Sequence, residues 1–242
     1  MDKFFDGVIS LLNAVREKER ENILKAATLV KDCLKNDKII HVYGTGHSQV
    51  LAVEIFCRAG GLVPVNGILD IGSSVYAGAL KSTGVERLPG YANILLNYYD
   101  VGEGDVLIII SNSGRNALPI EMAMGAKERG AKVIAVTSIK FSSSFPSRHP
   151  SGKRLYDVAD VVINNHVPIG DAFLEVEGLK TKIAPVSTII NSAILHAITS
   201  EAVRMLLEEG IEPSVWMSAN VPGSDEFNKE YIRKYKYRLK HL

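Results

Sequence analysis

Two short segments rich in glycine and hydroxyl groups each follow an apolar run. They are residues 44–48 (GTGHS) and residues 111–116 (SNSGRN). Glycine lets the backbone approach a ligand closely, and free N–H groups at a helix start suit a phosphate. For the second segment, capping of the next helix by serine or asparagine is the alternative interpretation. The residues predicted to bind a phosphate are Gly44, Gly46, Ser48, Ser111, Asn112, Ser113, Gly114 and Asn116.

The first segment does not match the nucleotide-binding loops that also use glycine. A dinucleotide loop requires a third glycine, but Gln49 stands there, and the next strand ends at Val65-Asn66 without an acidic residue. No Gly-Lys-Ser/Thr sequence follows, so the P-loop pattern fails as well. We therefore predict no NAD, no ATP and no other cofactor.

Three side chains are candidates for acid–base chemistry. His47 lies inside the first segment, and a histidine titrates near neutral pH. Glu175 and Glu177 alternate in a stretch expected to be extended, which places both carboxylates on one side. We predict that His47 polarises the substrate or opens its ring and that Glu175 or Glu177 is the base. An outward loop histidine and solvated acids are the alternatives.

The other histidines have simpler interpretations. His41 lies within a buried strand, and His196 is expected to pack on a helix. His41, His47, His149 and His166 show no close ligand spacing, so no metal site is predicted.

The segments that must position these residues alternate between helix and strand. Strands are predicted at 38–43, 62–65, 106–110, 132–136 and 161–163, and helices at 4–19, 21–35, 49–59, 91–99, 117–129 and 186–209. Residues 66–90 and 137–152 are expected to be irregular. Apolar strands with helical crossovers indicate an α/β fold with a covered parallel sheet. Ligands bind such sheets at the carboxyl ends of the strands, where both segments fall.

Composition narrows the class of protein further. The chain has 28 Lys+Arg against 27 Asp+Glu, so general electrostatic binding to nucleic acid is not expected. The longest apolar run is Val106–Ile110, far short of the ~20 residues that a membrane span requires. The first residues show no signal peptide pattern, so a cytoplasmic location is expected.

The two segments together resemble the SIS (sugar isomerase) domain. The matching pattern is GxGxS after the first strand and SxSG after a later strand, here Gly44, Gly46, Ser48, Ser111, Ser113 and Gly114, with Ile120 at the following helix start. The resemblance covers residues 35–210. It implies a three-layer α-β-α sandwich with a five-stranded parallel sheet, and a phosphorylated sugar whose phosphate is held by Ser48, Ser111 and Ser113. The tail, residues 218–226 (SANVPGSDE), is similar to that of a bacterial subgroup that carries the fold without an assigned reaction.

The sequence departs from the pattern at the catalytic positions of that family. Phosphoheptose isomerases and a muramic acid 6-phosphate etherase carry a glutamate ten residues after the serine, where this chain has Arg58, with Glu54 one turn earlier. The phosphoheptose isomerases also use a histidine on the long helix, and Asn191 stands at that position. Threonine is frequent in the family where Asn116 stands, and asparagine still donates a hydrogen bond.

Three functions remain open. The first is a sugar-phosphate isomerase acting on an aldose–ketose or amino-sugar phosphate pair. The second is a sensor that binds a phosphosugar without turnover, although the two short helices before the first strand are too little for a DNA-binding domain. The third is a lyase or etherase acting on an amino-sugar phosphate, which Arg58 disfavours.

The chain is expected to have three parts. Residues 1–36 form a helical pair that packs on the core or on a partner subunit, residues 37–210 form the SIS domain, and residues 211–242 form a tail. The tail carries basic residues and tyrosines, which we interpret as a solvated helix face or a subunit arm. Spare apolar surface on the helical pair predicts a dimer or tetramer.

Overall fold

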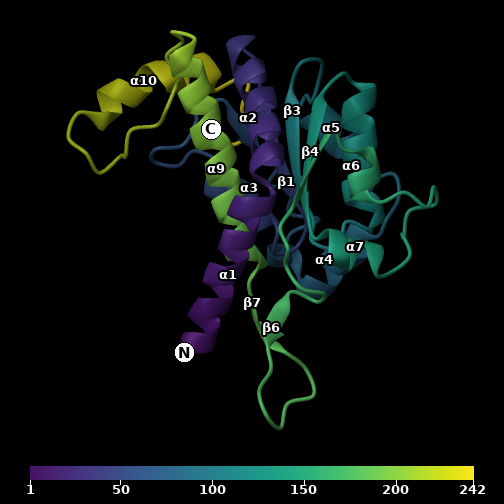
Figure 1. Cartoon of the computed structure of the whole chain (residues 1–242). Coiled ribbons are helices and arrows are strands. Elements are labelled where there is room, and N and C mark those ends of the chain that lie inside the picture. Colours follow the sequence, from purple (N-terminus) through teal and green to yellow (C-terminus); the bar gives the residue numbers. More distant parts are fainter.

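The computed structural model, which describes residues 1–242, has a five-stranded parallel sheet between two layers of helices (Figure 1). Its strands lie in the order β2-β1-β3-β4-β5. They are β1 (Ile40–Gly44), β2 (Val65–Gly67), β3 (Val106–Ile110), β4 (Lys132–Thr137) and β5 (Val161–Asn164). The predicted α/β sandwich and the helical pair at the N-terminus are confirmed.

Both faces of the sheet are buried under helices. One face packs against α1 (Asp2–Lys18), α2 (Arg20–Lys35), α3 (Gln49–Ile55) and α9 (Ser187–Glu208), and the other against α5 (Ala92–Tyr98), α6 (Ala117–Glu128) and α8 (Leu155–Val158). In β3, Val106, Ile108 and Ile110 belong to the first core, whereas Leu107 and Ile109 belong to the second. A strand buried on both faces has no polar side, which explains its continuous apolar sequence.

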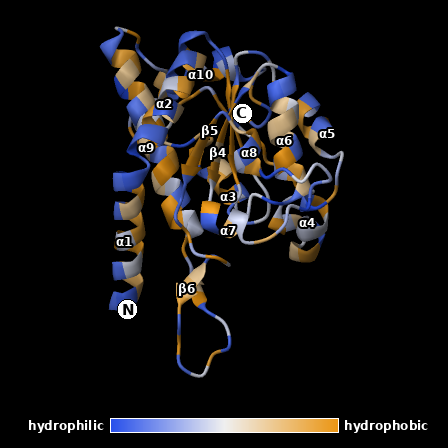
Figure 2. Ribbon diagram, turned by 45° about the vertical axis from the view of Figure 1, so that its right-hand side comes forward, coloured by the Kyte–Doolittle hydropathy of each residue, from blue (hydrophilic) through white to orange (hydrophobic).

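The remaining elements lie at the edges of the sheet. Near the carboxyl ends of the strands are the 3₁₀ turn η1 (Val75–Ala77), α4 (Ala79–Glu86) and α7 (Ile139–Ser143). The short antiparallel pair β6 (Ala172–Leu174) and β7 (Ile183–Pro185) forms a hairpin that projects from the body beside the first turns of α1 (Figures 1 and 2). The last helix, α10 (Ser224–Tyr235), lies at the opposite end (Figure 1). No helix has the length and apolar character needed to cross a bilayer.

Most predicted elements are found within a few residues of their expected bounds, but three predictions were wrong. The strand expected at 62–65 runs instead from Val65 to Gly67, as β2. Leu62 and Val63 are outside it because they pair with the C-terminal segment at Val215 and Ser214. The helix expected at 49–59 stops at Ile55, and Cys57 follows with a positive φ of 46°. The irregular regions also contain η1, α4 and α7.

The C-terminal tail packs on its own chain. Trp216, Tyr235 and Leu239 join Ile39 and Val63 in a third, smaller core. Three of the tail's basic residues pair with acids of the main body: Lys234 and Arg238 contact Asp37, and Lys240 contacts Asp100.

Candidate functional site

The first loop, residues 44–48, leaves the carboxyl end of β1 in a tight turn. A Cβ on Gly44 would lie 2.5 Å from the Ser48 carbonyl oxygen, so only glycine fits there. Gly46 has a φ of 56°, and its N–H donates to the Ser73 carbonyl at 2.9 Å. Ser48 is half-buried at the start of α3, and its hydroxyl does not cap that helix. The hydroxyl is therefore available to a ligand.

The second loop, residues 111–116, lies beside the first. Gly44 is opposite Ile110 in the β1–β3 register, so the two loops leave neighbouring strands at the same level. The Ser111 hydroxyl accepts the Gly114 N–H at 3.2 Å, and Ser111 is 5% exposed. Gly114 has a φ of 54°, and a Cβ there would lie 2.9 Å from Thr137 Oγ1. Ser111 thus closes the loop, whereas Ser113 is half-buried and its hydroxyl makes no hydrogen bond within the chain.

Asn112 is held by two other asparagines. Its side-chain oxygen accepts from Asn165 Nδ2 at 2.7 Å and from Asn191 Nδ2 at 3.3 Å, and Asn165 also donates to Asn191 Oδ1 at 2.9 Å. This amide cluster ties the second loop to the end of β5 and to α9. The structure therefore gives the Asn112 side chain a positioning role, and its contact with a ligand stays a prediction.

Asn116 occupies the N-cap position of α6 without capping it. Its Nδ2 donates to Glu86 Oε1, and its Oδ1 accepts from Arg148 Nη1 at 2.8 Å. Because the side chain turns away from the helix, the amides of Ala117 and Leu118 at the start of α6 are left without a side-chain acceptor, while Pro119 has no N–H. The capping alternative does not apply to Asn116, and those amides can bind an anion.

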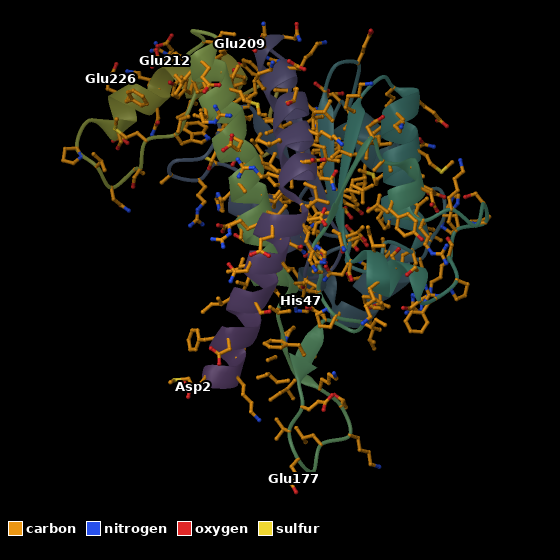
Figure 3. All side chains as sticks on the ribbon, in the orientation of Figure 1. Asp2, His47, Glu177, Glu209, Glu212 and Glu226 are labelled. Atoms are coloured by element: carbon orange, nitrogen blue, oxygen red, sulfur yellow. The ribbon has the colours of Figure 1, made fainter.

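The three predicted acid–base residues do not meet within one chain. His47 is exposed near the carboxyl ends of the strands, while Glu177 lies at the tip of the projecting hairpin (Figure 3). Glu175 is on the same hairpin, where a 2.9 Å contact from Lys182 lowers the pKa of its carboxyl group. Neither carboxylate contacts His47 or any other residue of the 44–48 loop.

A different acid–base pair connects α3 with α9. His196 Nε2 lies 3.0 Å from Glu54 Oε1, and Glu54 Oε2 accepts from Arg58 Nη1 at 2.8 Å. The His196 side chain is 45% exposed, so it is accessible rather than packed as expected. Glu54, Arg58 and His196 are each distinctive in the sequence, but nothing in the sequence joins them. The spacing of Glu54 and Arg58 indicates only their own contact, and no local pattern connects either residue with a histidine 142 positions away from Glu54.

Fold and site together define a class: a parallel α-β-α sandwich with two adjacent glycine–serine loops at its carboxyl edge. The family model described as SIS domain matches residues 3–138. Similar relatives include the UPF0309 protein GK1441 of Geobacillus kaustophilus, 42% identical over 239 residues that cover 99% of this chain and 95% of that protein. A UPF0309 protein of Brucella anthropi is 42% identical over 241 residues, covering 100% of this chain and 98% of its own.

Among solved structures, a phosphoheptose isomerase from Francisella tularensis has a similar fold. Its TM-score is 0.56 at 18% sequence identity, covering 84% of this chain and 96% of the isomerase. The chain belongs to the SIS domain family, as the residues of the two loops indicated.

Proposed function

We propose that the protein binds a phosphorylated sugar at its carboxyl edge and isomerises it. The observation that carries the proposal is the adjacency of the two loops together with the uncapped start of α6. Backbone amides, with the hydroxyls of Ser48 and Ser113, can surround a phosphate dianion without a metal. The sugar then extends along the rim formed by the strand ends.

Isomerisation moves a proton between adjacent carbons through an enediol, so it requires a base and a group that polarises the carbonyl. The Glu54–His196 pair is one candidate, because a carboxylate that contacts an imidazole orients it for proton transfer and α3 begins at the first loop. His47 with Glu175 or Glu177 is the other candidate, and it requires the hairpin of a second copy. We infer self-association as a dimer or tetramer on the same ground.

The test is a thermal-shift screen of sugar phosphates followed by NMR of each stabilising compound in deuterium oxide. An isomerase exchanges the proton at C2 of the bound sugar for deuterium. Stabilisation without exchange over hours contradicts the catalytic part and favours a sensor. Release of a substituent from the sugar favours a lyase or etherase, and absence of any stabilising sugar phosphate contradicts the whole proposal.

A further inference from the structure

Three arginines gather beside the second loop. Arg115 is part of the loop, Arg148 lies in the segment after α7 and donates to Asn116 at the end of the loop, and Arg87 directly follows Glu86, whose carboxylate also binds Asn116. The backbone N–H of Arg148 donates to the Arg115 carbonyl at 2.8 Å, so two of these segments are joined at the cluster. The arginines that do form ion pairs, Arg58, Arg204 and Arg238, are elsewhere in the fold.

Two of the guanidinium groups are held in place before any ligand binds. Arg148 Nη1 donates to Asn116 Oδ1 at 2.8 Å, and Arg115 Nε donates to the Pro146 carbonyl at 2.8 Å. The Arg115 guanidinium also lies 5.4 Å from the centre of the Phe145 ring. A guanidinium has five N–H donors, so each of these arginines keeps most of its donors for another partner.

The cluster concentrates positive charge. Partial burial, followed by the charges of Arg115 and Arg87, lowers the pKa of Arg148, while Glu86 acts in the opposite sense. The Glu86 carboxylate accepts from Asn116 Nδ2 and forms no ion pair with any of the three arginines. Like charges repel, and a site that holds them together is relieved by an anion.

The arginines are tied to residues other than the phosphate-binding groups of the loop. Arg115 is fixed to the 145–146 segment, and Arg148 is fixed to the side chain of Asn116, which turns away from α6. The amides at the start of α6 and the hydroxyl of Ser113 are therefore left for one phosphate. An anion on the arginines would then be a second group of the same ligand.

We propose that Arg87, Arg115 and Arg148 bind a second anionic group of the ligand, so that the preferred ligand is a phosphosugar carrying a further phosphate or a carboxylate. The planar guanidinium matches both groups with paired hydrogen bonds. This inference rests on the proposed function, because it takes the first phosphate to occupy the two loops.

The experiment is calorimetric titration of the full chain with three probes: fructose 6-phosphate, fructose 1,6-bisphosphate and 6-phosphogluconate. We expect at least one doubly anionic probe to bind ~10-fold or more tightly than fructose 6-phosphate. Which of the two does so distinguishes a second phosphate from a carboxylate. In Arg115→Gln and Arg148→Gln that advantage falls by ~10-fold or more, since a charge-assisted hydrogen bond contributes about one to two decades.

The controls separate the inference from the proposed function. If the arginines bind the second anionic group alone, the affinity of both variants for fructose 6-phosphate stays within ~3-fold of the wild-type value. Arg204→Gln, which removes an arginine paired with Glu201 on α9, leaves all affinities unchanged. Arg148→Lys keeps the positive charge. Binding that is retained in Arg148→Lys but lost in Arg148→Gln therefore comes from the missing charge and not from misfolding.

Equal affinity for all three probes overturns the inference and leaves the proposed function standing. An equal loss of fructose 6-phosphate binding in the variants also overturns it, because the arginines then serve the first phosphate. If no probe binds and no other sugar phosphate stabilises the protein, both the inference and the proposed function are wrong.

Discussion

The two serines of the second loop have different surroundings, so they are expected to respond differently to substitution. Ser113→Ala removes a half-buried hydroxyl that we propose binds the phosphate, so it should weaken phosphosugar binding ~10–150-fold with little change in Tm. Ser111→Ala leaves the Gly114 N–H without its acceptor, so it should also lower the free energy of unfolding by about 0.5–1.5 kcal/mol. Calorimetric titration and urea denaturation of both variants measure the two effects.

A matched control is Ser143→Ala, which removes an exposed hydroxyl on α7 that contacts only its own helix. It should change neither quantity. If Ser113→Ala destabilises the fold and leaves affinity unchanged, Ser113 is a structural residue and the phosphate is held elsewhere.

The Glu54–His196 pair makes a second prediction at the level of single residues. If Glu54 or His196 carries the proton, Glu54→Gln and His196→Gln should each slow deuterium exchange at C2 by ~10²–10⁴-fold with nearly unchanged ligand affinity. Glu201→Gln, on the same helix as His196, is the control. If deuterium exchange continues in Glu54→Gln and His196→Gln but is lost in His47→Ala, Glu175→Gln or Glu177→Gln, the acid–base residues are His47 and the hairpin glutamates.

The position of the two candidate loops at the ends of β1 and β3 could be predicted from sequence because each loop is a continuous segment with its own glycines. The contacts around these loops could not be predicted from sequence. Asn112, Asn165 and Asn191 are brought together by three separate elements, and Glu54 and His196 by two. Asparagine and glutamate are common residues, and nothing in their local spacing distinguishes such members of a cluster from solvated side chains.

At the level of elements, Asp105 joins the start of β3 to β1. Its carboxylate accepts the Ile39 N–H at 2.9 Å and the Gly102 N–H at 3.0 Å, and it lies 3.3 Å from His41 Nε2. Burial acts to raise the pKa of Asp105, but the contacts with His41, Ile39 and Gly102 outweigh it and lower the pKa.

A lowered pKa makes part of the stability depend on pH. The folded state holds the carboxylate more strongly than the unfolded chain, whose Asp pKa is ~3.9, so this contribution is complete well above pH 4 and is lost as pH falls through the folded pKa. Asp105→Asn should therefore cost about 1–3 kcal/mol at pH 7 and less near pH 3. Urea denaturation at pH 7, 5 and 3 measures it, and a cost that is constant with pH contradicts it.

The strands of the central sheet were predictable because burial on both faces requires continuous apolar runs such as Val106–Ile110. The edge was not. Leu62 and Val63 are as apolar as a strand, but they pair with Val215 and Ser214, about 150 positions later. A local pattern shows that a segment favours an extended backbone and does not show which segment it pairs with.

At the scale of the whole molecule, projecting apolar side chains predict assembly. Phe5 and Ile9 on α1 are 55% and 54% exposed, and Val176, Leu179 and Ile183 on the adjacent hairpin are also exposed. Light scattering at micromolar concentration should give at least twice the 26.4 kDa of one chain. Phe5→Glu with Ile9→Glu should shift the mass toward the monomer, and a wild-type monomer contradicts the prediction.

The pairing of the last residues with the first half of the sheet also determines when the protein can finish folding. Lys240 donates its N–H to the Asn66 side chain of β2, His241 contacts Tyr99, and Arg238 contacts Asp37. The partners in these three contacts are 142 to 201 positions apart in the chain. The β2 edge and the core around Trp216 can therefore close only after the segment beyond α9 has been made, later than the pairing of the central strands.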